Sequence, residues 1–105
     1  MTDYVVILVT AGSEAEAEKI AKALVEERLA ACVNLVSPLR SIYRWEGKIA
    51  DGREWLLFIK TQADKFSAIA SRVKALHSYQ VPEVIALPIV AGAEAYLRWL
   101  GDEIA

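Results

Sequence analysis

Apolar positions along the chain form four extended segments of two kinds. Residues 4–9 are an unbroken apolar run, and the segment 55–60 is apolar up to Lys60, which is typical of strands buried on both faces. Residues 31–45 and 83–89 are also extended, but each contains a proline. Proline cannot donate to a sheet ladder, so it favours an edge strand or a bulge. The pattern therefore predicts two central strands and two edge strands.

The segments between these strands have apolar residues at helical spacing. Ser13 and Glu16 have the spacing of a capping box, in which Ser13 accepts the Glu16 amide and the Glu16 carboxylate reaches back. Apolar residues then recur at helical intervals up to a predicted helix end near Ala30. A second apolar stripe predicts a helix over residues 64–77, and a short C-terminal helix is expected after Gly92.

The predicted elements follow the order β-α-β-β-α-β, with the extra helix at the end. Turn residues at 46–48 and 51–52 are expected between the second and third strands. This order defines an α+β, ferredoxin-like split fold with an antiparallel sheet. Right-handed crossovers place both helices on one face and the first and third strands in the middle. We therefore predict a single domain over residues 1–105, with one sheet face bare of helices.

The apolar content of the chain is high for its size. Residues of the AVILMFWYC set make up 55% of the 105 residues, against roughly 45–50% in ordinary domains even when glycine is counted. A small domain has much surface for its volume, and an exposed apolar sheet face is an interaction or aggregation site. A homo-oligomer is therefore expected.

Charge and length exclude several kinds of partner. The formal net charge is -2, whereas nucleic-acid binding requires a basic face. No apolar run reaches the roughly 20 residues of a membrane span, and the N-terminus lacks the basic region of a signal peptide. The single cysteine cannot form a disulfide within the chain. We expect a cytoplasmic protein without nucleic-acid or membrane partners.

Three residues are candidate metal ligands. His77 is the only histidine and is either a ligand for copper or zinc or the end of the second helix, where it bonds free carbonyls. Cys32 follows a helix C-terminus, which disfavours a thiolate, so a buried thiol is favoured over a ligand for Cu(I). Glu83 is the third candidate. One chain has too few ligands for a structural zinc site, whereas symmetric copies can bring ligands together.

A second set of residues is expected at a cleft or a subunit interface. Aromatic side chains stack planar ligands and also concentrate binding energy at interfaces, and the apolar surplus favours an interface. No phosphate loop, GxSxG or GxGxxG motif is present, and the chain is not expected to be an enzyme. The residues of this set are Tyr43, Trp45, Trp55, Lys60, Tyr79, Tyr96 and Trp99.

Longer stretches resemble a known family. ACVNLVSPLRSIYRWEGKI, the pair Lys60-Thr61, HSYQVPEVIALPI and YLRWL are similar, in order and spacing, to the CutA family of divalent-cation tolerance proteins. The resemblance implies a ferredoxin-like fold and a tight homotrimer, in which the long second and third strands extend the sheets of neighbouring subunits. It also implies an architecture similar to that of the PII signalling proteins, which bind small effectors in clefts between subunits.

The resemblance leaves three functional hypotheses. The first is a trimeric protein of divalent-cation, above all copper, tolerance, with His77 as a ligand, assisted by Cys32 or Glu83. The family draws metal ligands from a first-strand cysteine and a histidine pair, and this chain has Val9 and Leu76 at two of those positions. The second is a PII-like sensor of a small molecule in the inter-subunit clefts. The third is a trimeric module that acts through a protein partner.

Overall fold

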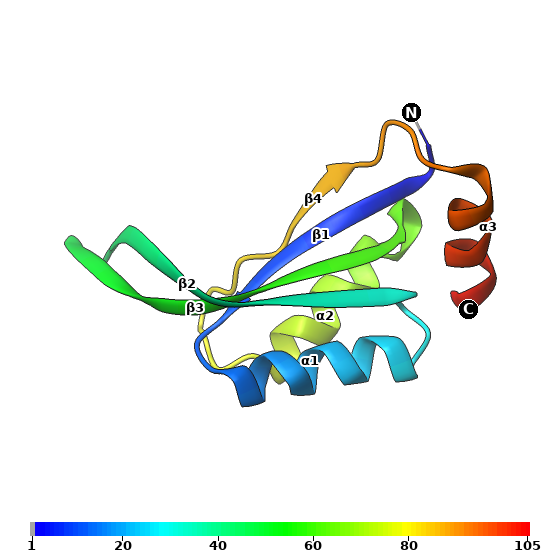
Figure 1. The fold of residues 1–105 in the computed structure, drawn as a ribbon. Coiled ribbons are helices and arrows are strands. Elements are labelled where there is room, and N and C mark those ends of the chain that lie inside the picture. The colour runs from blue at the N-terminus through cyan, green and yellow to red at the C-terminus, as the bar shows by residue number, and fades with distance from the viewer. Residues whose placement is uncertain (1) are drawn as a thin grey trace.

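A four-stranded antiparallel sheet forms the centre of the computed structural model, which describes residues 2–105 (Figure 1). Its strands lie in the order β2-β3-β1-β4. β1 (Tyr4–Ala11) and β3 (Lys48–Gln62) are central, and β2 (Cys32–Trp45) and β4 (Ile85–Pro88) are the edges. The predicted α+β, ferredoxin-like arrangement is confirmed, including a proline in each edge strand.

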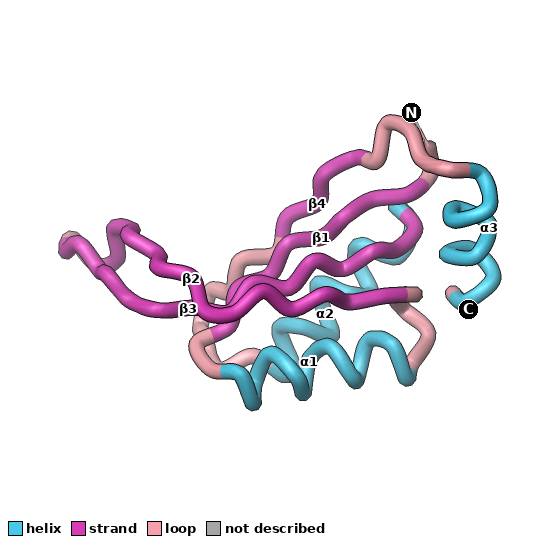
Figure 2. Tube along the Cα trace, in the orientation of Figure 1, coloured by secondary structure: helices cyan, strands magenta, loops and turns pink. Residues whose placement is uncertain are grey.

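The helices are distributed unequally around the sheet. α1 (Glu14–Glu26) and α2 (Phe66–Leu76) lie on the same side of the sheet, and the 3-10 turn η1 (Ala63–Lys65) leads into α2. α3 (Glu94–Glu103) lies at the end of the sheet where β1 begins (Figure 2). Within the described residues, no helix is long and apolar enough to cross a membrane.

The core lies between the sheet and the helices α1 and α2. On the helix side of the sheet, Ile7 pairs with Ile59 and Val9 with Leu57, and all four are fully buried. Burial of each such side chain contributes roughly 1.5–3 kcal/mol. The helices contribute the fully buried residues Ile20 and Leu24 of α1 and Ile69 and Val73 of α2.

The opposite face of the sheet is only partly covered by the chain itself. Residues of β1 and β3 that alternate with the core positions, such as Leu8 and Phe58, are half-buried. Toward the edges, Val36 is 45% exposed and Leu87 is 48% exposed. The sequence predicts that the two central strands are buried on both faces. In a single chain they are fully buried on the helix side only. We call this side, comprising Val6, Leu8, Val36, Leu56, Phe58, Ile85 and Leu87, the open face.

The strands β2 and β3 continue as a two-stranded arm beyond the rest of the sheet (Figure 1). The arm closes in a turn at Glu46 and Gly47, which have φ of 50° and 77°, as a tight hairpin requires. The predicted turn at 51–52 is wrong, because both residues pair with β2 inside β3. There Arg40 and Asp51 form an ion pair at 2.6 Å across the strands. β3 therefore begins at Lys48 rather than near residue 55.

Smaller differences concern the ends of elements. The register shift between Val36 and Leu39 confirms the bulge expected at the proline. α1 ends at Glu26, not near Ala30, because Arg28 has a left-handed φ of 57° and the chain turns back there. The Ala30 amide then donates to the Leu24 carbonyl.

Candidate functional site

His77 ends α2 and is held on both ring nitrogens. Its backbone amide donates to the Val73 carbonyl at 2.8 Å, and its side chain is fully buried. Nε2 lies 2.6 Å from the Thr10 carbonyl oxygen, to which it donates. Nδ1 accepts the Tyr79 amide at 3.0 Å and also lies 3.0 Å from Oε1 of Glu16. The imidazole thus ties the end of α2 to β1 and lies close to Glu16 of α1.

This geometry does not suit a metal ligand within one chain. A metal requires the lone pair of a ring nitrogen, and both nitrogens of His77 are already in use. Cys32 pairs with Lys60, whereas Thr10, the partner of His77, pairs with Leu56. Four strand residues separate these levels, or about 13 Å. In the described part of the chain, no three His, Cys, Asp or Glu side chains are grouped to hold a metal ion.

Glu16 connects α1 to the segment after α2. Ser13 Oγ accepts the Glu16 amide at 3.2 Å, which confirms the predicted N-cap. The carboxylate of Glu16, however, accepts the Ser78 amide at 3.2 Å. The reciprocal half of the capping box is therefore wrong, because the carboxylate is used in a tertiary contact instead.

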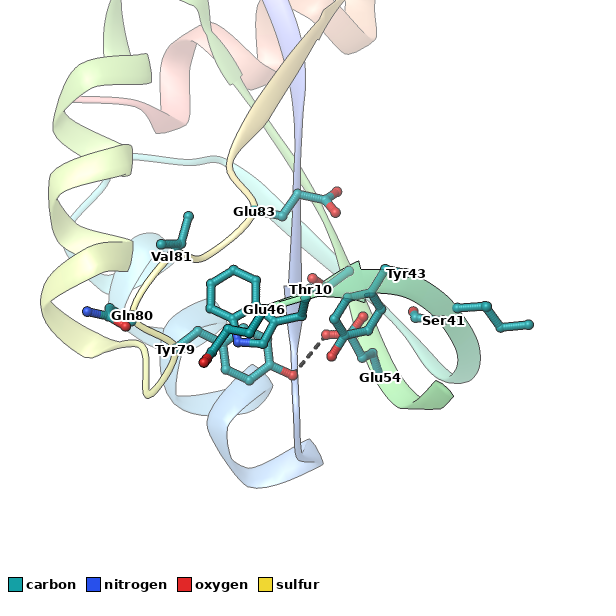
Figure 3. Close-up of a pocket in the computed structure, with 11 residues that line it drawn as sticks. Thr10, Ser41, Tyr43, Glu46, Glu54, Tyr79, Gln80, Val81 and Glu83 are labelled. Carbon is teal, nitrogen blue, oxygen red and sulfur yellow. Dashed lines mark hydrogen bonds between the residues drawn. The ribbon is translucent and has the colours of Figure 1, made fainter. Parts of the chain in front are cut away.

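A pocket of about 700 Å³ lies between the β2–β3 arm and the segment 79–83 (Figure 3). The arm contributes residues of β2 and β3 to the lining, and Thr10, near the end of β1, also lines the pocket. Four of the residues predicted for a site come together here. They are Tyr43, Trp45, Tyr79 and Glu83.

One of the lining residues of this pocket is a buried carboxylate. Glu54 is 7% exposed, and its Oε2 accepts a hydrogen bond from Tyr79 Oη at 2.9 Å (Figure 3). Burial and this hydrogen bond raise the pKa of the Tyr79 phenol, which stays protonated as the donor. Partial burial and the charge of Glu54 raise the pKa of Glu83. The pocket thus has three acidic side chains in its lining, Glu46, Glu54 and Glu83, and no lysine, arginine or histidine among its described lining residues.

The other predicted site residues lie elsewhere. Trp55 lies on the helix side of the sheet, half-buried against the core. Lys60 is at the opposite end of β3, where its Nζ lies 3.4 Å from Tyr96 Oη. The Tyr96 ring in turn lies 5.7 Å from that of Trp99. The predicted set therefore divides among three places, one of which is the pocket beside the arm.

Sequence reasoning did not single out Glu54 and Thr10. The signal for Glu54 was its position, since it shares a strand face with the apolar residues Leu56 and Phe58. A carboxylate on such a face is unusual unless it is paired or functional. Thr10 contributes its backbone carbonyl to His77, and no side-chain pattern predicts that contact.

The fold and the pocket define a ferredoxin-like α+β protein with a long hairpin arm beside one pocket. The family model of the CutA1 divalent ion tolerance proteins matches residues 5–103. The chain therefore belongs to the CutA1 family, as the sequence resemblance implied.

Individual relatives are similar over most of this chain. A divalent-cation tolerance protein CutA from Thermus thermophilus is 57% identical over 97 residues, which cover 92% of this chain and 94% of the relative. A solved structure from Thermus thermophilus, described as a divalent cation tolerance protein (Cut A1), has a TM-score of 0.94 at 53% identity and covers 97% of this chain and 99% of that one. A CutA structure from Xylella fastidiosa has a TM-score of 0.95 at 42% identity, over 99% of this chain and 100% of that one.

Other relatives are longer. The human protein CutA is 49% identical over 92 residues, which cover 88% of this chain but 51% of the relative. The chain thus spans about half the length of that relative.

Proposed function

We propose that this chain forms a homotrimer in which copies cover one another's open faces, and that the trimer acts in tolerance to divalent cations. The role is supported by the names of relatives up to 57% identical. The trimer is supported by the open face, and the number three comes from the family resemblance.

The open face is the observation that carries the assembly. It runs across all four strands, from Val36 at one edge to Leu87 at the other, and neither α1 nor α2 covers it (Figure 2). Burying apolar surface gains about 25 cal/mol per Å², and monomers rarely expose contiguous apolar patches of this kind. A second copy with the same face supplies the matching surface.

Light scattering after size exclusion tests the assembly. The expected mass is about 35 kDa, three times the 11.6 kDa of one chain. Phe58→Glu places a charge on the open face and is expected to yield a lower mass, whereas Lys22→Glu, on the exposed side of α1, keeps the parent mass. A parent protein that runs as a monomer at micromolar concentration would refute the trimer.

For the metal, copper foremost, we propose a site that draws ligands from more than one copy. The fit within one chain is poor, because the His77 nitrogens are occupied and no three-ligand group exists among the described residues. Calorimetric titration with Cu(II) is expected to give fewer ions than chains, with the heat reduced in Cys32→Ser, whose thiol is only partly buried. One ion for each chain in the monomeric Phe58→Glu variant would contradict a shared site.

The tolerance role is proposed as binding rather than catalysis, in the cytoplasm. The alternative that the sequence leaves open, a sensor of small molecules, gains support from the pocket around Glu54. A protein-interaction module, the third hypothesis, would have to use the same open face that copies of the chain cover in the proposed homotrimer.

A further inference from the structure

We propose that the pocket between the β2–β3 arm and the segment 79–83 binds a small organic cation with N–H donors, of the primary ammonium or guanidinium class. Its lining includes Tyr43 and Trp45 of the β2–β3 arm, so in the homotrimer proposed above the pocket would lie beside the arm that meets a neighbouring copy. Its charge, an under-used buried carboxylate and its aromatic walls each point to this class of ligand.

The charge of the lining selects a cation. Three carboxylates line the pocket, those of Glu46, Glu54 and Glu83, and none of its described lining residues is a lysine, arginine or histidine. The neighbours whose negative charge raises the pKa of Tyr79 are Glu54, Tyr43 and Glu16, and none of them is a base. A concave site lined by one sign of charge concentrates ligands of the opposite sign, so anionic effectors are excluded.

The second observation is the bonding of Glu54. This carboxylate is more than nine-tenths buried, yet the described residues give it one hydrogen bond, from Tyr79 Oη. A carboxylate offers about four acceptor positions, and buried charges are normally paired and hydrogen-bonded. Glu54 therefore presents unused acceptor capacity at the pocket, which an ammonium or guanidinium group satisfies with both charge and N–H donors.

The walls favour an organic ligand over a bare metal ion. Tyr43, Trp45 and Tyr79 line the pocket, and aromatic faces attract organic cations. A metal such as Ca²⁺ takes six or more oxygen ligands, whereas the described acidic groups form no cluster of three. The volume of about 700 Å³ suits a small organic molecule.

Calorimetric titration with 2-phenylethylammonium tests the site, with 2-phenylethanol as the uncharged control of nearly equal shape. We expect the parent protein to bind the ammonium compound at least tenfold more tightly than the alcohol. Glu54→Gln is expected to weaken ammonium binding at least tenfold, and Glu83→Gln severalfold. Glu94→Gln, an exposed carboxylate on α3, keeps the parent affinity.

Several results would overturn the proposal. One is the absence of binding heat when 2-phenylethylammonium is added to the parent in 10-fold molar excess over a millimolar protein sample. The others are an equal affinity of the parent for the amine and the alcohol, or an equal affinity of the parent and Glu54→Gln for the amine. If Cu(II) or Mg²⁺ binds more tightly than the amine and displaces it, and Glu54→Gln abolishes this displacement, the pocket is a metal site instead. Should Glu54→Gln fail to fold, as judged by circular dichroism, Glu83→Gln and Tyr43→Ala take its place, and unchanged binding in both refutes the site. The mass of the ligand-free parent protein is measured by light scattering without the amine, so a failure of amine binding and a failure of the trimer are distinguishable.

Discussion

Removal of the Tyr79 hydroxyl measures how much its hydrogen bond to the buried Glu54 carboxylate contributes to stability. In Tyr79→Phe the ring remains, but the carboxylate loses the hydrogen bond that Tyr79 Oη donates at 2.9 Å. Glu54 is 7% exposed, so water cannot fully replace the donor. Leaving a buried acceptor without a partner costs about 1–3 kcal/mol, and more when the acceptor is charged. We therefore expect a loss of about 2–3 kcal/mol in the free energy of unfolding.

Urea unfolding followed by circular dichroism gives this value, at one fixed protein concentration because assembly contributes to stability. The same substitution in a Glu54→Gln background closes a double-mutant cycle. There the acceptor is neutral, so the hydroxyl is expected to contribute only about 0.5–1.5 kcal/mol.

The pH dependence of the same pair has a definite sign. The pKa of Tyr79 is raised by burial and by Glu54, so the folded state holds the phenolic proton more tightly than the unfolded state. The stability from this group is complete below the unfolded pKa of about 10 and is lost as the pH rises above it. The difference between parent and Tyr79→Phe should therefore shrink above about pH 10. A difference under about 0.5 kcal/mol at neutral pH, or one that grows in alkali, would refute this account of the Glu54 site.

Three further substitutions test the local structure. Ser13→Ala removes the cap of the Glu16 amide and should cost about 1 kcal/mol in urea unfolding; no loss would contradict the cap. Gly47→Ala should cost about 1–2 kcal/mol because φ is 77° there, whereas Gly52→Ala, at an ordinary φ with open space around it, should not destabilise. Gly101→Ala places a Cβ 2.5 Å from Tyr4 Oη and should lower the melting temperature, with recovery in the Tyr4→Phe background; an equal loss in both backgrounds would exclude this contact.

The sheet was predictable because its signals are redundant along the chain. Apolar runs identified the central strands, and the prolines at 38 and 88 identified the edges. The length of the arm was not predictable, since Asp51 and Gly52 have the composition of a turn. Pairing with β2 and the ion pair to Arg40 outweigh that local preference.

The site was harder to predict because its contacts join segments far apart in sequence. The hypothesis that His77 is a helix end agrees with its geometry, yet its carbonyl partner belongs to Thr10 on β1 rather than to α2. Glu16 was assigned to its own helix cap, where local spacing places it, but its carboxylate bonds to Ser78. Only tertiary structure decides between such local and distant partners for one carboxylate.

The arrangement of β3 links the two proposals. Glu54, Leu56 and Phe58 share one face of this strand, with the carboxylate at the pocket and the apolar pair on the open face. A second copy that covers Leu56 and Phe58 also removes water beside Glu54, which strengthens its attraction for a cation. Binding and assembly must then favour each other reciprocally. We therefore expect 2-phenylethylammonium to lower the concentration at which the oligomer dissociates, as measured by light scattering on dilution, and Glu54→Gln to abolish that shift. If the parent protein binds the amine but its dissociation concentration does not change, the pocket is too far from the interface for the two to be coupled.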